Sequence, residues 1–93
     1  SDAARTLLRA MPNLSEKLVM PALSAATADD ASLEAFRSEL AAWLADRAET
    51  DPAAARLWLK QARINGEAEQ LNMDAAQVAA KLVAGLYELA QPV

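Results

Sequence analysis

The chain holds few of the side chains on which enzyme active sites and metal centres depend. Among its 93 residues there is no histidine and no cysteine, and glycine occurs only twice. Zinc sites built from Cys or His, disulfide bonds and catalytic groups with histidine as the base are therefore excluded. Two glycines are also too few for a glycine-rich phosphate-binding loop.

Acid–base chemistry would have to rely on Asp, Glu, Lys and the single tyrosine, Tyr87. Asp29 and Asp30 are adjacent, but acids belong at the start of a helix because the helix dipole favours them there. A dimetal carboxylate centre would need Glu-x-x-His pairs, and no run of alternating acids forms a calcium-binding loop. We therefore expect a protein that is not an enzyme and that holds neither a metal nor a cofactor.

Three bases are spaced so that they share one face of a helix. Arg56, Lys60 and Arg63 follow one another at intervals of four and three residues. Such a face can bind the phosphates of a nucleic acid or an acidic protein, joined by Arg5 and Arg9 if their helix packs alongside. The alternative is a solvated face that balances nearby acids. A net charge of -4 argues against broad, non-specific binding to nucleic acid.

The elements that position these residues are all expected to be helices. Alanine fills 24 positions and leucine 14, whereas β-branched residues are scarce and no stretch alternates between polar and apolar residues. Only 26 large apolar side chains are present, which is enough for one modest core. The sequence therefore predicts an all-α fold, a compact bundle of four to five short helices that forms a single domain over residues 1–93.

The first two helices are limited by prolines. One is expected over residues 3–11, with Asp2 as its N-cap and Pro12 after it. A second begins after Asn13 as N-cap, and Pro21 is expected to shorten or kink it. Residues 24–30 then read as a connection.

The third and fourth helices carry the clearest apolar patterns. Asp30 is the expected N-cap of the third, which runs to about residue 48. Asp51 and Pro52 begin the fourth, as N-cap and first helical residue. Gly66 either ends this helix in a left-handed conformation or lies within it, and both alternatives stay open. The stripe of the third helix is made by Leu33, Phe36, Leu40, Trp43 and Leu44.

The last helix is the most apolar. It is expected over residues 75–90 with Asp74 as its N-cap, and its large apolar side chains spread around more than half of its circumference. A helix of this kind lies at the centre of a core or forms half of an interface.

Together these patterns predict a non-catalytic helical module for protein–protein interaction or oligomerisation, which binds another protein or itself. Leu82, Leu86 and Tyr87 are the expected contact residues, with Trp58 as a further one. Trp43 and Trp58 lie on apolar stripes, so a place in the core is the first expectation for both, and an exposed anchor for a partner is the alternative. The second hypothesis is a small helical nucleic-acid-binding domain that uses the face formed by Arg56, Lys60 and Arg63. A small-molecule pocket between helices is the third.

No segment of the sequence is suited to a membrane. The longest apolar tract, residues 73–93, is interrupted by Asp74, Lys81 and Glu88. The first residues do not have the pattern of a signal peptide, so we expect a cytoplasmic location. The sequence begins at Ser1 rather than Met, and a domain cut from a longer chain remains an alternative.

Overall fold

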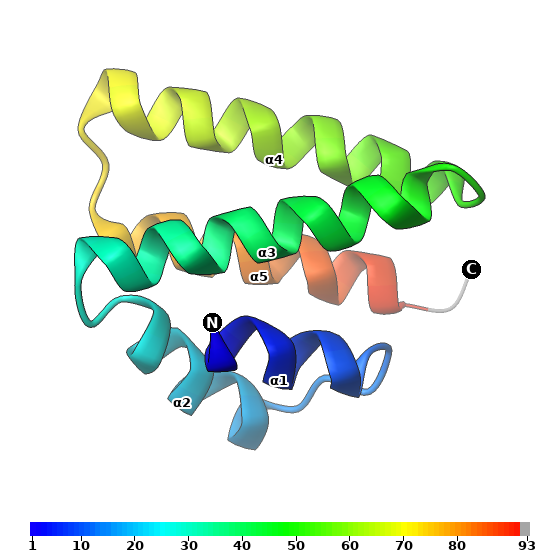
Figure 1. Ribbon diagram of the computed structural model, residues 1–93, viewed down its shortest axis with the longest axis horizontal. Helices are drawn as coiled ribbons and strands as arrows, with labels where there is room; N and C mark the ends of the chain where they lie inside the picture. The colour runs from blue at the N-terminus through cyan, green and yellow to red at the C-terminus, as the bar shows by residue number, and fades with distance from the viewer. Residues whose placement is uncertain (92–93) are drawn as a thin grey trace.

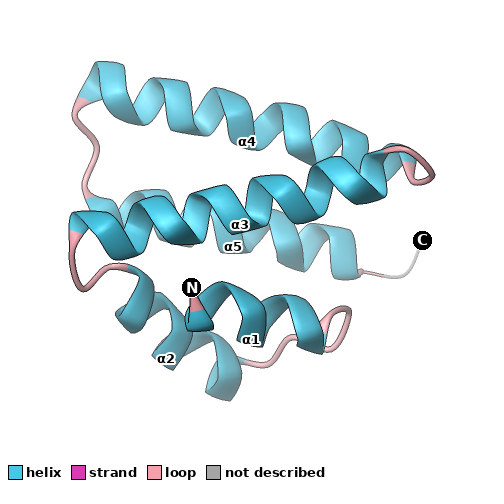
Figure 2. Ribbon diagram, viewed as in Figure 1, coloured by secondary structure: helices cyan, strands magenta, loops and turns pink. Residues whose placement is uncertain are grey.

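The computed structural model describes residues 1–91, in which five helices follow one another with short connections (Figure 1). No strand occurs in this part of the chain (Figure 2), so the predicted all-α bundle is confirmed. The helices are α1 (Asp2–Ala10), α2 (Glu16–Ala26), α3 (Asp30–Ala48), α4 (Pro52–Leu71) and α5 (Ala75–Ala90).

The helices form a flat slab. Its extents are 33 × 29 × 18 Å, and the shortest is about the thickness of two packed helices. Figure 1 shows α3 and α5 one behind the other in the middle, with α4 along one edge and α1 and α2 along the opposite edge. Within residues 1–91, α4 packs against α3 and α5 and against neither of the first two helices.

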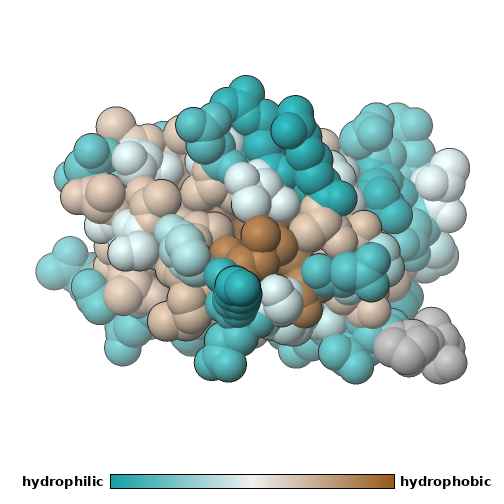
Figure 3. Space-filling model, turned by 90° about the horizontal axis from the view of Figure 1, so that it is seen from below, coloured by the Kyte–Doolittle hydropathy of each residue, from teal (hydrophilic) through white to brown (hydrophobic). Residues whose placement is uncertain are grey.

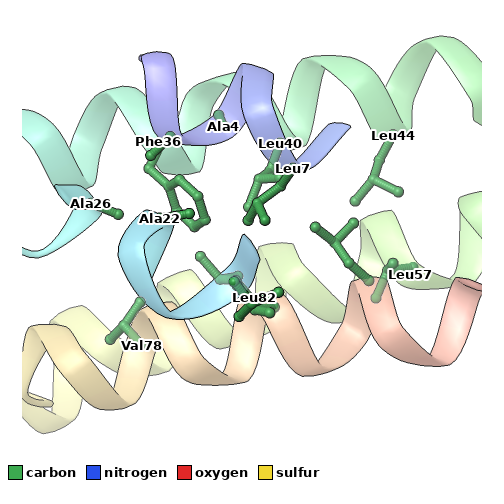
Figure 4. Close-up of a cluster of buried hydrophobic side chains, with 14 of the residues drawn as sticks. Ala4, Leu7, Ala22, Ala26, Phe36, Leu40, Leu44, Leu57, Val78 and Leu82 are labelled. Atoms are coloured by element: carbon green, nitrogen blue, oxygen red, sulfur yellow. The ribbon is translucent and has the colours of Figure 1, made fainter. Parts of the chain in front are cut away.

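The core lies between α3 and α5 and is closed by side chains from the other helices. Figure 4 shows Phe36 and Leu40 of α3 and Leu82 of α5 pointing into one space. The stripe predicted for α3 supplies three fully buried side chains, while Leu33 and Trp43 are half-buried. The largest fully buried side chains are Phe36, Leu7, Leu40, Leu44, Leu82 and Leu86.

Three predicted N-caps are wrong by one or two residues. The side chain of an N-cap accepts a hydrogen bond from a backbone N–H two or three residues further on, and this geometry selects the residue. The clearest case is Asp29, whose Oδ1 accepts from the backbone N–H of Ser32 at 2.7 Å. The caps are corrected from Asp2 to Ser1, from Asn13 to Ser15 and from Asp30 to Asp29. Asp51 is confirmed, because its Oδ1 accepts from the N–H of Ala53 at 3.0 Å.

The second helix continues through its proline, which corrects the predicted shortening. Pro21 lies inside α2 with its ring exposed, and residues 24–26 are helical rather than part of a connection. Proline removes one backbone hydrogen bond, but Ala22 and Ala26 beyond it are buried and anchor the last turn. The hydroxyl of Thr27 also donates to the carbonyl of Leu23 at 2.8 Å and closes the helix end.

The question left open at Gly66 is answered by the structure. Helix α4 runs unbroken across Gly66 to Leu71. Its left-handed residue is Asn72, with φ 52° and ψ 48°, whose N–H donates to the carbonyl of Ala68. Asparagine is one of the few side chains that tolerate this conformation. Asp74 occupies the N-cap position of α5 as predicted, although its side chain makes no capping hydrogen bond.

Candidate functional site

Two predicted contact residues of the last helix lie inside the domain. Leu82 and Leu86 are fully buried, so they are corrected from partner contacts to core residues. Because α5 packs against α2, α3 and α4, its broad apolar circumference serves the chain's own core. Tyr87 is half-buried and packs against this core. Of the four predicted contact residues, only Trp58 is classed as exposed, at 40%.

The exposed large apolar side chains concentrate on α4. Leu59 is 60% exposed and Leu71 is 69% exposed, and Trp58 lies on the same helix. Met20 of α2 is the fourth, at 58%. The other tryptophan, Trp43, is half-buried, and the guanidinium of Arg47 lies over its ring, 4.5 Å from the centroid. The candidate contact surface therefore lies on helix α4.

Helix α4 has a second apolar stripe on the side that faces away from the core. Its buried side is made by Leu57, Gln61 and Ala68, together with Ala54. The opposite side repeats small or apolar residues at intervals of four, three and four, which keeps them in one line along a helix. We call this line and the neighbouring Trp58 the outer face of α4; the line consists of Ala55, Leu59, Ala62 and Gly66. The sequence pattern already favours the inward side as the main stripe, because Leu57 and Ile64 lie on it, whereas the outer line has Leu59 as its one large apolar residue.

The predicted basic face lies beside this line. Arg56, Lys60 and Arg63 are all exposed and share one flank of α4, as their spacing predicts. The Nζ of Lys60 lies 3.4 Å from Oε2 of Glu88 on α5. Within residues 1–91, neither Arg56 nor Arg63 forms an ion pair. We call these three bases the basic flank of α4.

Two further bases do not join the basic flank. Arg5 and Arg9 belong to α1, which packs against α2 and α3 at the opposite edge of the slab (Figure 1). The condition under which Arg5 and Arg9 would join the basic flank, that α1 packs beside α4, is therefore not met. The side chain of Arg5 is instead paired with Asp2 on its own helix.

A groove of about 220 Å³ lies between the basic flank and α5. Arg56 and Lys60 line one side of it, and Glu88 and Leu89 line the other. Its only acid, Glu88, is paired with Lys60 across the groove.

Two contacts set how closely α4 approaches α5. A Cβ on Gly85 would lie 2.5 Å from Cδ1 of Leu57, so the absence of a side chain at Gly85 permits the approach. Gln61 is 3% exposed, and its Nε2 donates to the backbone carbonyl of Leu82 at 3.1 Å. A hydrogen bond of this kind satisfies a buried polar group and favours one alignment of the two helices. Neither contact is predicted by the local sequence pattern.

The other concave surfaces carry less information. A groove of about 280 Å³ between α2 and α5 contains the exposed Met20 and no charged side chain. Figure 3 shows the side of the domain on which α1 and α2 lie, where a small hydrophobic patch is surrounded by polar and weakly apolar side chains. The groove with Met20 therefore lacks the charge that lies beside the exposed apolar side chains of α4.

Two acidic groups of the described residues have lowered pKa values, and both are explained by local hydrogen bonds. The pKa of Asp29 is lowered by the hydrogen bonds it accepts from Ser32, first from the backbone N–H. The pKa of Asp2 is lowered by the hydrogen bond and the charge of Arg5. Residues 1–91 contain no cluster of three acids that could hold a metal ion, and no helix among them is long and apolar enough to span a membrane.

The chain was compared with protein-family models, with curated proteins and with solved structures, and no match was found.

Proposed function

We propose that this domain is a non-catalytic helical module that binds another protein through the outer face of α4. The observation that carries the proposal is the exposure of Leu59 and Trp58 on a side of α4 that the core does not use. Full burial of a leucine contributes about 1.5–3 kcal/mol, and tryptophan is enriched among the residues that dominate binding energy. A partner that covers both side chains gains this free energy without any change in the fold.

The shape of the outer face suits a partner helix. Helix α4 has 20 residues and is therefore about 30 Å long. The intervals of four, three and four along its outer line are those at which two packed helices interlock. Ala62 and Gly66 are small, so a second helix can approach the backbone closely over this part of α4.

The test is affinity capture from the source organism with three forms of the domain in parallel. Leu59→Glu places a charge in the middle of the outer face, and Thr6→Glu makes a matched change on α1 at the opposite edge. We expect at least one protein to be retained by the wild type and by Thr6→Glu and to be lost with Leu59→Glu. If every captured protein is retained by Leu59→Glu, the outer face is not the binding surface. Cell fractionation tests the cytoplasmic location that we include in the proposal.

Nucleic-acid binding is the second candidate, and the exposed basic flank is the observation that favours it. Three bases on a domain of net charge -4 can support only weak binding that decreases steeply with salt. Fluorescence anisotropy with a labelled DNA duplex at low salt tests this candidate. No binding at low salt, or binding unchanged when Arg56, Lys60 and Arg63 become Ala, eliminates it.

A further inference from the structure

We infer that the partner of the outer face is an amphipathic helix that carries acidic residues along one edge, beside the basic flank of α4. This inference rests on the proposed function, because it assumes that the outer face is a binding surface. It adds the chemistry of the partner and the place where its charges must lie.

The local charge of the first three quarters of α4 is positive. Residues 52–66 of α4 contain three bases and no acid, although the whole chain has a net charge of -4. Arg56 and Arg63 are exposed and form no ion pair within residues 1–91, so their guanidinium groups are available to a partner. Guanidinium groups bind carboxylates through two parallel hydrogen bonds. A partner attracted only by the domain's net charge would be basic, whereas one fitted to this surface is acidic.

The bases of the basic flank have the same spacing along α4 as the residues of the apolar line. Each base of the flank immediately follows a residue of the line: Arg56 follows Ala55, Lys60 follows Leu59 and Arg63 follows Ala62. A helix lying along α4 presents its own neighbouring rows at the same intervals. Carboxylates three or four residues apart on one edge of the partner would therefore meet the bases while its apolar row covers Leu59.

The position of the next acid limits where the partner's carboxylates can lie. Glu67 lies four residues after Arg63 on the same side of α4, but its charge is negative. The basic stretch from Arg56 to Arg63 covers about 10 Å of helix, or two turns. We therefore expect the partner's acids to occupy about two turns, with a neutral or basic residue opposite Glu67.

A second copy of this chain fits the surface less well. If two α4 helices paired through their outer lines in the same direction, two-fold symmetry would place their basic stretches on opposite sides of the contact, where residues 52–66 of the other copy supply no acid to either stretch. In opposite directions the stretches would lie on the same side and overlap, because Arg56 to Arg63 spans the middle of the line from Ala55 to Gly66. Overlap of like charges is unfavourable, and a partner with acids removes this cost.

The experiment is selection from a display library of 25-residue peptides randomised at every position, with the intact domain as bait. Three variants are compared with the wild type: Leu59→Glu, the double variant Arg56→Glu/Arg63→Glu, and the control Arg9→Glu on α1. We expect peptides that depend on Leu59 to carry acids at intervals of three and four. Their affinity should fall at least about tenfold with the double variant, stay within about twofold with the control, and weaken as salt is raised. Circular dichroism checks that each variant keeps its helices.

The failures of the two proposals are distinguishable. Peptides that bind in a Leu59-dependent way but are neutral or basic overturn the inference about the partner's charge and leave the proposed function standing. The absence of any Leu59-dependent peptide overturns both. Light scattering on a dilution series supplies the remaining outcome, because a Leu59-dependent dimer would assign the outer face to a second copy and overturn the acidic partner.

Discussion

The continuity of α4 can be tested by substituting one of its residues, Gly66→Ala. Gly66 is exposed to solvent and lies well away from both ends of the helix. Its φ angle is not positive, and a Cβ added at this position would have no neighbouring atom within 4 Å. The new methyl group is therefore expected to cause neither strain nor new packing. The substitution therefore measures only the difference in helix propensity between alanine and glycine.

That preference is about 0.8–1.0 kcal/mol in favour of alanine. Because the packing contribution is close to zero, we expect Gly66→Ala to stabilise the domain by about this full amount. For a domain of this size, 1 kcal/mol raises the melting temperature by about 4–8 °C. Urea unfolding followed by circular dichroism gives the free energy, and a thermal scan gives the melting temperature.

Gly85→Ala is the matched contrast, because both substitutions gain the same helix preference. At Gly85 the Cβ would lie 2.5 Å from Cδ1 of Leu57, where ordinary contacts begin at 3.4 Å. Leu57 is 6% exposed and must move, and overpacking of this kind costs about 1–3 kcal/mol. We therefore expect Gly66→Ala to exceed Gly85→Ala in stability by about 1–3 kcal/mol.

If α4 were interrupted at Asn65 and Gly66, the glycine would adopt a left-handed conformation that costs alanine about 1–2 kcal/mol. Gly66→Ala would then destabilise the domain, and this result would refute the unbroken helix. Equal stabilisation by both substitutions would refute the close approach of α4 and α5 at Gly85.

Three further predictions concern the core, a cap and the buried amide. Leu82→Ala should cost about 2–5 kcal/mol in urea unfolding, because Leu82 is fully buried, and should leave the affinity of a partner unchanged once the domain is folded. Asp29 has a folded-state pKa below its ordinary value of 3.8, so its ionised form contributes stability that is complete above about pH 4 and is lost as the pH falls through the lowered pKa. Asp29→Asn removes this charge, so the difference in melting temperature between the wild type and the variant should shrink when both are scanned from pH 6 to about pH 2.5. Gln61→Met keeps the length of the side chain and removes the hydrogen bond to Leu82, so its stability in urea should stay within about 1.5 kcal/mol of wild type. Gln61→Ala, which also leaves a cavity, should cost clearly more.

The helical fold could be predicted from the sequence because its signals are local. Alanine content, the stripe on α3 and the Asp51–Pro52 start of α4 each depend on residues close together in the chain. The path of α2 through Pro21 could not be predicted in this way. Beyond the proline, Ala22 and Ala26 are buried against the core, and this tertiary contact is not visible in the local sequence.

The candidate site was predicted only in part. The basic flank follows directly from the spacing of Arg56, Lys60 and Arg63, which any helix converts into one face. The placement of Leu82 and Leu86 was wrong because an apolar helix looks the same in sequence whether its neighbours come from its own chain or from a partner. The exposure of Leu59 depends on which side of α4 meets α3 and α5, and this is decided only when the helices pack.

The position of α4 at the edge of the slab has a consequence for how such a domain can change over evolutionary time. Since α4 packs against α3 and α5 and, within residues 1–91, not against the first two helices, substitutions on its outward side leave the remaining helix contacts in place. The inward residues Leu57 and Gln61 hold α4 against the core. The residues at positions 55, 59, 62 and 66 can be substituted without changing these inward contacts. One scaffold can therefore acquire new binding specificities through a handful of substitutions on a single helix, with little loss of stability at each step.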